Sequence, residues 1–190
     1  MAEFDLIARI AARALTRADV DIGIGDDGAL LSMPHGQRLV AVCDTVNCGV
    51  HFPENTAPEA IGWKALAVNL SYLAAMGATP AWVLLSLSLP NEDAAFADAL
   101  MDGFLQLADQ VGVALVGGDT KRGPLSLTVT GLGVVPTNAV LRRDAAKVGD
   151  VVCVSGSLGD AAAGLRLALS LPSQTSTEHA FLIERLNRPT

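Results

Sequence analysis

The stretch Val83-Leu84-Leu85-Ser86-Leu87-Ser88-Leu89 alternates between apolar and small polar side chains. This period of two predicts a β-strand with one buried face. Apolar side chains then recur at helical spacing as far as Val111, which predicts an amphipathic helix that Asn91 caps at its start. A second apolar strand is expected at 113–116, ending at Gly117-Gly118. A strand–helix–strand unit therefore lies at the centre of the chain.

The same patterns predict further elements on both sides of this unit. Helices are expected at 4–16, 58–76, 160–169 and 178–186, and strands at 39–43, 125–135 and 151–155. Thr56 and Glu59 form a predicted capping box for the helix that begins at Pro58. Helices and strands alternate irregularly, and the strand at 125–135 is long. This pattern favours an α/β chain of the α+β type, with a mixed β-sheet and helices on one face, over a doubly wound parallel sheet.

Composition limits the possible partners. The 190 residues suffice for one or two domains, and the net charge of −7 argues against nucleic acid and anionic membranes as partners. The longest apolar runs are too short to span a bilayer. Cys43, Cys48 and Cys153 have no metal-ligand spacing, which indicates reduced thiols. The N-terminal segment carries acids and no long apolar core, so we expect no signal peptide and a cytoplasmic protein.

Three short clusters hold carboxylates at expected strand ends or tight turns. They are Gly23-Ile24-Gly25-Asp26-Asp27, Cys43-Asp44-Thr45 and Gly117-Gly118-Asp119-Thr120. Glycine lets a backbone approach a ligand closely, and carboxylate oxygens are preferred Mg²⁺ ligands. The clusters therefore indicate Mg²⁺ ions held against phosphates, because an acidic protein needs cations to bind anions. Each cluster alone is also compatible with a structural turn: an Asx turn, a strand-ending turn or a hairpin-like turn.

A set of motifs in a fixed order covers almost the whole chain. Besides the clusters above, it includes Glu3-Phe4-x-Leu6-Ile7, Leu73-Ala74-Ala75-Met76-Gly77-Ala78-x-Pro80-Ala81-Trp82, Arg122-Gly123-Pro124-Leu125-Ser126 and Gly156-x2-Gly159-Asp160-x-Ala162-Ala163-Gly164. Single pieces are common, but the ordered set resembles the thiamine-monophosphate kinase family. The resemblance implies transfer of the ATP γ-phosphoryl group to thiamine monophosphate, giving thiamine diphosphate, with several Mg²⁺ ions.

The resemblance also implies how the chain is organised. Residues 1–148 correspond to an ATP- and Mg²⁺-binding domain that forms a homodimer, whose sheets pair across the two-fold axis into a β-barrel. Residues 149–190 correspond to the beginning of a second α/β domain, which is truncated here. The family needs no nucleophilic side chain or general base, because phosphoryl transfer relies on positioning and charge neutralisation.

The family motifs assign metal ligands to particular residues. Asp27, Asp44 and Asp119 correspond to carboxylates that bind Mg²⁺ in the family. The two positions before Asp44 usually offer oxygen ligands as well, and here they are Val42 and Cys43. Neither side chain carries a hydroxyl group, so the backbone carbonyls are the oxygens that these two residues offer.

The family motifs also assign substrate contacts. Gly118, Asp119 and Arg143 correspond to residues that contact ATP, and His51 corresponds to a residue that contacts thiamine monophosphate. An arginine fork suits charge on a transferring phosphoryl group. Without the resemblance, the sequence around Arg143 and His51 predicts only that both are solvated loop residues.

One position departs from the family pattern. The family motif Asn-Leu-Ser-Asp ends in an aspartate that bridges metal ions, whereas this chain has Asn69-Leu70-Ser71-Tyr72. A neutral phenol does not replace a carboxylate at a hard cation. Asn69 and Tyr72 lie three residues apart and therefore on one helix face. The resemblance to the family implies that this face looks toward Asp27 and Asp44.

Two alternative functions therefore stay open. One is a catalytically impaired or truncated kinase-like dimer that binds nucleotide weakly, because Tyr72 replaces a metal ligand. The other is a different ATP-dependent enzyme of the same superfamily, such as aminoimidazole ribonucleotide synthetase or selenophosphate synthetase. The N-terminal motifs of those enzymes differ from the ones found here.

Overall fold

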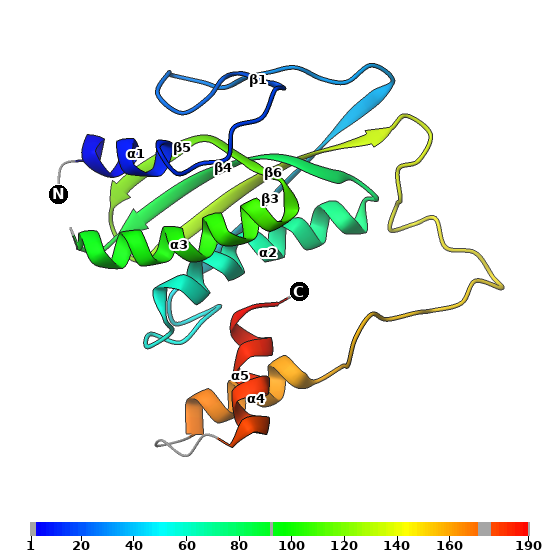
Figure 1. The fold of residues 1–190 in the computed structure, drawn as a ribbon. Coiled ribbons are helices and arrows are strands. Elements are labelled where there is room, and N and C mark those ends of the chain that lie inside the picture. Colours follow the sequence, from blue (N-terminus) through cyan, green and yellow to red (C-terminus); the bar gives the residue numbers. More distant parts are fainter. Residues whose placement is uncertain (1–2, 92, 171–175, 190) are drawn as a thin grey trace.

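The computed structural model describes residues 3–91, 93–170 and 176–189. The elements in chain order are α1 (Glu3–Ala11), β1 (Val20–Ile22), β2 (Leu30–Leu31), β3 (Gln37–Asn47), α2 (Pro58–Ala75), β4 (Thr79–Leu89), α3 (Ala94–Val111), β5 (Ala114–Arg122), β6 (Ser126–Pro136), α4 (Asp160–Ser170) and α5 (Thr177–Asn187). Figure 1 shows the long strands in one sheet, with α2 and α3 along the same face of it. No helix in the described ranges is both long and apolar enough to cross a membrane.

The main sheet is mixed, as the sequence predicts. Its strand order is β3-β6-β4-β5, in which β6 is antiparallel to both β3 and β4, and β5 is parallel to β4. The parallel pair requires a long crossover connection, which α3 provides. A separate sheet of β1 and β2 packs against the face opposite α2 and α3, where Val20 and Leu31 contact Trp82 and Val116 (Figure 1).

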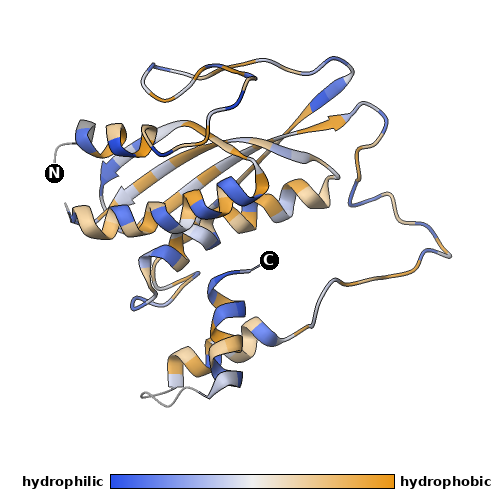
Figure 2. Ribbon diagram, viewed as in Figure 1, coloured by the Kyte–Doolittle hydropathy of each residue, from blue (hydrophilic) through white to orange (hydrophobic). Residues whose placement is uncertain are grey.

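The largest core lies between the main sheet and the pair of helices α2 and α3. Leu85, Leu87 and Leu89 of β4 are buried in it, whereas Ser86 is exposed. Figure 2 shows apolar residues along the central strands and on the long helices. The alternation that predicts β4 therefore also determines which face of the strand meets the helices.

Two glycines let α2 and α3 approach each other backbone to backbone. A Cβ at Gly62 would lie 1.9 Å from the Leu100 carbonyl oxygen, and a Cβ at Gly103 would lie 1.8 Å from the Glu59 carbonyl oxygen. Both obstacles are backbone atoms, which cannot rotate away as a flexible side chain can. The close crossing of these helices therefore depends on glycine at both positions.

The predicted helix ends are wrong in three places. α3 begins after Asp93, whose carboxylate accepts a first-turn backbone N–H at 3.1 Å, so Asp93 rather than Asn91 is the cap. α2 begins after Ala57 without a side-chain cap, so the predicted capping box does not form. Pro58 in the first turn has no backbone N–H, so one fewer N–H at this helix end requires a capping side chain. α1 ends at Ala11 rather than at residue 16.

The strands also differ from their predicted lengths. β5 continues through its glycines to Arg122, and β3 reaches from Gln37 to Asn47 rather than over 39–43. Pairing with β4 and β6 supplies backbone hydrogen bonds that outweigh the low strand propensity of glycine and aspartate. The predicted strand at 151–155 is wrong, because these described residues are exposed and pair with no other strand.

The helices α4 and α5 follow an extended stretch, residues 137–159, that contains no helix or strand (Figure 1). The end of α5 returns to α2, where the Trp63 indole N–H donates to the Pro189 carbonyl oxygen at 3.1 Å. The Arg188 guanidinium lies 5.3 Å from the centre of the Trp63 ring, a cation–π distance. The predicted domain boundary between residues 148 and 149 falls in the extended stretch and stays a prediction.

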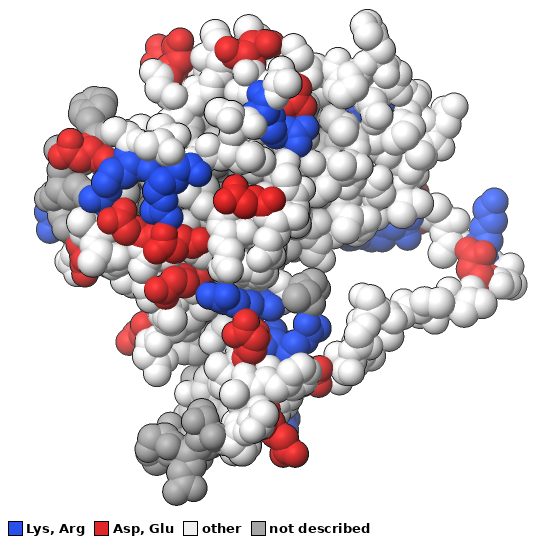
Figure 3. Space-filling model, in the orientation of Figure 1, with Lys and Arg blue, Asp and Glu red and all other residues white. Residues whose placement is uncertain are grey.

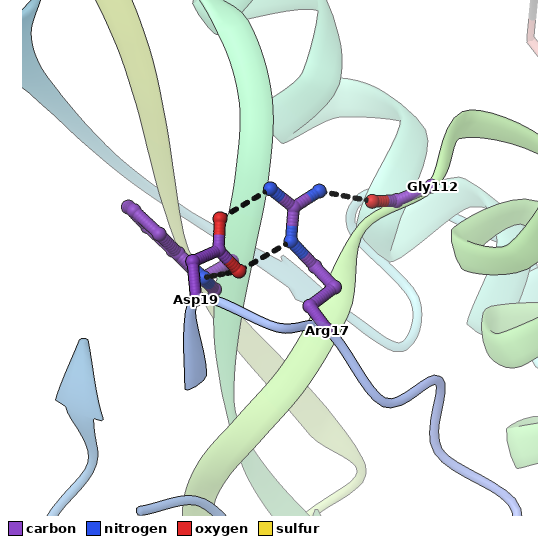
Figure 4. Close-up of polar contacts among 4 residues, drawn as sticks. Arg17, Asp19 and Gly112 are labelled. Carbon is purple, nitrogen blue, oxygen red and sulfur yellow. Dashed lines mark hydrogen bonds and ion pairs between the residues drawn. The ribbon is translucent and has the colours of Figure 1, made fainter. Parts of the chain in front are cut away.

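An ion pair within the segment between α1 and β1 is hydrogen-bonded to β4 and to the residue that caps α3 (Figure 4). The Arg17 guanidinium donates to the two carboxylate oxygens of Asp19 at 2.9 and 2.6 Å, and to the Gly112 carbonyl oxygen at 2.7 Å. The Trp82 indole N–H donates to Asp19 at 3.2 Å. The hydrogen bond from Arg17 is the main reason why the pKa of Asp19 is lowered. These four residues are called the Arg17–Asp19 anchor below.

We expect Gly103→Ala to lower the free energy of unfolding by about 3 kcal/mol, the upper end of common overpacking costs. The added methyl group would overlap the Glu59 carbonyl group. Urea denaturation followed by circular dichroism measures the change. Gly28→Ala is the control, because a Cβ at Gly28 meets nothing within 4 Å. A Gly103→Ala variant as stable as the wild type would contradict the close helix crossing.

We expect Asp19→Asn to lower the free energy of unfolding at pH 7 by about 1.5 kcal/mol, as for a hydrogen bond to a charged group. Because folding lowers the pKa of Asp19, its stabilisation is present above the unfolded-state pKa and is lost as the pH falls through the folded-state pKa. The difference between wild type and variant should therefore disappear at acidic pH, below about 4. Urea denaturation at a series of pH values measures it, and a difference that does not change with pH would refute this role.

Candidate functional site

A cavity of about 400 Å³ opens between α1, the loop that connects β1 to β2, and the strands β4 and β5. One wall is apolar and includes Ile7 and Ile10 of α1 and Leu115 of β5. The other wall consists of residues 25–27 and 117–120, which are rich in glycine and aspartate. The cavity therefore brings together two of the three carboxylate clusters found in the sequence.

Asp27 and Asp119 line this cavity from different elements. Asp27 lies in the loop between β1 and β2, and its backbone N–H donates to the Asp26 carboxylate at 2.8 Å. Asp119 lies in β5 and pairs with the Lys121 ammonium group at 2.6 Å. This ion pair is largely exposed, so it is weak in water and a cation can compete for the carboxylate. Two of the predicted metal ligands thus share one cavity.

Gly118 permits β5 to approach β4 closely beside the cavity. Its φ angle is 151°, and a Cβ at this position would lie 1.9 Å from the Leu85 carbonyl oxygen. A residue with a side chain fits here only if β4 moves. Gly117 and Gly118 therefore line the cavity with backbone atoms, which suits contact with an anion.

Asp44 lies on the opposite edge strand of the sheet. The strand register pairs Asp44 with Val129, Val129 with Leu85, and Leu85 with Gly118, which forms one row across the sheet. Three strand spacings separate Asp44 from Gly118, or about 14 Å. Within the described ranges, no three aspartate, glutamate, histidine or cysteine side chains lie close enough to hold one metal ion. The structure thus does not gather Asp44 with the two carboxylates of the cavity.

Tyr72 faces Asp44, as the resemblance implies, but it is not on the cavity that holds Asp27, so the expected approach to Asp27 is not found. Its hydroxyl donates to Asp44 Oδ2 at 3.3 Å, and the Thr45 backbone N–H donates to Oδ1 at 2.7 Å. One turn earlier on α2, the amide of Asn69 is buried, and its Oδ1 has no hydrogen-bond partner. The β3 edge of the sheet therefore carries a second group of oxygen atoms.

His51 lies in a tight turn after β3. The Asn47 backbone N–H donates to His51 Nδ1 at 3.0 Å, so the neutral ring carries its proton on Nε2. The Lys64 ammonium reaches the His51 carbonyl oxygen at 3.5 Å from a buried position on α2. Burial lowers the pKa of Lys64, because desolvation disfavours the charged form. Sequence reasoning missed Lys64, since a lysine on a helix is usually solvated.

The remaining predicted residues lie away from the cavity. Arg143 is exposed on the extended stretch and does not line the cavity. Cys43 and Asp44 are neighbours in β3 and point to opposite faces of the sheet. The Cys43 thiol is exposed and accepts from the Thr130 hydroxyl at 3.8 Å. Residues Val42 and Cys43 can therefore offer a metal near Asp44 only their backbone carbonyls.

Comparison with known proteins adds to this geometry. Residues 25–135 match the family of AIR synthase related proteins, N-terminal domain. The chain belongs to this family. The matched range contains residues 25–27 and 117–120, so the polar wall of the cavity lies within the family domain.

The chain is similar to several thiamine-monophosphate kinases. The enzyme from Salmonella typhimurium is 46% identical over 99% of this chain and 58% of its own length. A crystal structure of the kinase from Stenotrophomonas maltophilia K279a is 54% identical, with a TM-score of 0.87, and covers 100% of this chain and 62% of that chain. A structure of AaThiL complexed with AMPPCP and TMP is 35% identical, with a TM-score of 0.78, over 99% of this chain and 59% of that chain.

These comparisons confirm the resemblance that the ordered motifs predict. They also agree with the mixed sheet and its helices. The chain spans about three fifths of the length of the Salmonella typhimurium kinase.

We expect Tyr72→Asp to lower the melting temperature without metal by about 2–4 °C, the shift that corresponds to about 1 kcal/mol in a chain of this size. A second carboxylate beside Asp44 would repel the first, and Mg²⁺ would relieve that repulsion. Thermal melting with and without millimolar Mg²⁺ measures both effects. Tyr72→Asn is the control, because it removes the phenol without adding charge. If Mg²⁺ stabilises both variants equally, residue 72 is not beside a metal position.

Proposed function

We propose that this chain forms the nucleotide-binding part of a thiamine-monophosphate kinase. The reaction is transfer of the ATP γ-phosphoryl group to the phosphate of thiamine monophosphate, which gives thiamine diphosphate. The observation that carries this proposal is the cavity in which the Asp27 loop meets Gly118 and Asp119. The identity to thiamine-monophosphate kinases over nearly the whole chain supports the same substrates.

The two walls of the cavity suit the two ends of ATP. The apolar wall of Ile7, Ile10 and Leu115 suits a nucleobase, which binds mainly through apolar contacts. The backbone of Gly117 and Gly118 suits the phosphates. With this orientation, the triphosphate lies beside the carboxylates and the base lies against α1.

The donor atoms of the cavity fit Mg²⁺. The carboxylates of Asp27 and Asp119 are hard oxygen ligands, and Mg²⁺ sites commonly combine one or two carboxylates with phosphates and water. When bound, Mg²⁺ neutralises charge between the phosphates and the acidic protein. Asp27 and Asp119 orient the nucleotide, and no side chain of this site has to act as a nucleophile or base.

The β3 edge is the proposed side for the second substrate. Asp44, the unpaired Oδ1 of Asn69 and one of the backbone carbonyls of Val42 and Cys43 could serve as oxygen ligands for a further cation, because consecutive carbonyls of an edge strand point alternately toward β6 and away from it. His51 Nε2 offers a hydrogen-bond donor to thiamine monophosphate. Arg143 reaches the ATP phosphates in this proposal only through a rearrangement of the extended stretch.

A homodimer is part of the proposal. β3 is an edge strand, and the face of the main sheet away from α2 and α3 carries exposed side chains such as Leu39 and Cys43. Pairing of two such sheets into a barrel would remove exposed strand edges. Free thiols at Cys43, Cys48 and Cys153 support a cytoplasmic location.

An impaired kinase-like dimer is the second candidate. Tyr72 favours this candidate, because its hydroxyl donates a hydrogen bond to one carboxylate oxygen of Asp44 and supplies no charge for a metal ion. The comparisons do not favour it, since relatives at 40–46% identity are thiamine-monophosphate kinases. The same relatives argue against the other superfamily enzymes, aminoimidazole ribonucleotide synthetase and selenophosphate synthetase.

We expect ATP to bind in the presence of Mg²⁺ and to bind at least about tenfold more weakly without it, a difference of about 1.4 kcal/mol. The carboxylates of the cavity repel the free nucleotide, whereas a Mg²⁺ ion would bind both the carboxylates and the phosphates. Asp119→Asn should weaken Mg²⁺-dependent binding by a similar factor. Isothermal titration calorimetry measures these affinities. Asp109→Asn, on the exposed face of α3, is the matched control and should bind like the wild type.

Two results would refute the proposed function. One is equal ATP affinity with and without Mg²⁺. The other is an Asp119→Asn variant that retains the wild-type affinity.

A further inference from the structure

The loop that carries Asp27 has few anchors of its own. It connects the short strands β1 and β2, which form a two-stranded sheet of their own in the described part of the chain. Asp26, Asp27 and Gly28 are exposed, and so are Ile22 and Leu30 on either side. Ile24 and Ala29 are partly buried against the core, so they hold the two sides of the loop, whereas the residues at its tip have no buried side chain among them.

The base of the same hairpin is held firmly. The Asp19 carbonyl oxygen accepts the Ser32 backbone N–H at 2.9 Å, which closes the hairpin at its base. The Asp19 carboxylate, in turn, accepts from Arg17 and from the Trp82 indole of β4. Asp19 therefore joins the hairpin to the main sheet through its backbone and its side chain together (Figure 4).

The anchor also reaches the start of β5. Arg17 donates to the carbonyl oxygen of Gly112, which caps α3 two residues before β5 begins. Trp82 pairs in register with Ala114, the first residue of β5. β5 then leads to Asp119. The Arg17–Asp19 anchor thus connects the roots of the two segments whose tips form the polar wall of the cavity.

We propose that Arg17 and Asp19 are positioning residues that set the placement of Asp27 relative to Gly118 and Asp119. This inference rests on the proposed function, because it assigns the anchor an effect on Mg²⁺-dependent nucleotide binding. A shared metal requires its carboxylates at well-defined positions, and a loop alone does not provide that precision. The bidentate fork of arginine fixes both distance and direction, which an ammonium group does not.

Surface charges near the anchor do not provide the same link. Figure 3 shows acidic and basic side chains distributed over this face. The ion pairs Arg9–Asp98 and Arg13–Asp102 join α1 and the residues just after it to α3, and neither involves the hairpin. Among the contacts found in the described residues, the anchor is the charged link between the hairpin base and the main sheet.

The test compares Arg17→Lys and Asp19→Asn with a matched control. Arg142 and Asp144 form a bidentate pair of the same spacing, at 2.9 and 2.7 Å, on the exposed extended stretch. Asp144→Asn therefore makes the same chemical change where no hairpin depends on it. All variants are studied at a temperature where circular dichroism shows them fully folded.

Two readouts separate positioning from simple stabilisation. Hydrogen exchange of the ligand-free protein should become faster at residues 23–28 in Asp19→Asn and Arg17→Lys, but not in Asp144→Asn. Calorimetry should give about tenfold weaker Mg²⁺-dependent ATP binding for the two anchor variants, and wild-type binding for the control.

A double-mutant cycle tests whether Asp19 acts through Asp27. If it does, Asp27→Asn costs much less affinity in an Asp19→Asn background than in the wild type. Folded anchor variants that bind Mg²⁺-ATP like the wild type, or additive effects in the cycle, would overturn the inference. A wild-type protein that does not bind Mg²⁺-ATP would instead refute the proposed function. The exchange data would then still decide whether the anchor orders the loop.

Discussion

The close approach of β5 to β4 at Gly118 is the constraint on which the rest of the site depends. No Cβ fits between Gly118 and the Leu85 carbonyl, so the parallel pairing of these strands requires glycine there. That pairing brings the backbone of β5 and the Asp119 carboxylate to the cavity. The rest of the polar wall comes from the loop of a hairpin, whose base is joined to the sheet by the Arg17–Asp19 anchor. The candidate site therefore combines a rigid strand with a loop that is fixed at its base.

The sheet also separates the candidate site into two regions. One row of residues runs from Gly118 through Leu85 and Val129 to Asp44, with the cavity at one end and the Tyr72–Asp44 contact at the other. Under the proposed function, ATP and thiamine monophosphate would each bind from one of these two regions. Positioning and charge neutralisation are the means of catalysis available to such a site.

The sequence predicts those parts of the fold in which local pattern and tertiary environment agree. The alternation in β4 and β6 and the apolar stripe of α3 identify buried faces correctly. The resemblance correctly puts Tyr72 beside Asp44, but not beside the cavity of Asp27. The extension of β5 through its glycines is not predictable from propensity, because the partner strand supplies the stabilising hydrogen bonds. The run 151–155 has the composition of a strand but no partner here. The anchor joins residues far apart in the chain, and no local signal marks such a contact.

The most direct test of the account is a crystal structure of this chain with Mg²⁺ and a non-hydrolysable ATP analogue. The account predicts the triphosphate between the Asp27 and Asp119 carboxylates, along the backbone of Gly117 and Gly118, with the base against α1. An analogue bound elsewhere on the chain, with the cavity between α1 and β5 left unoccupied, would contradict it.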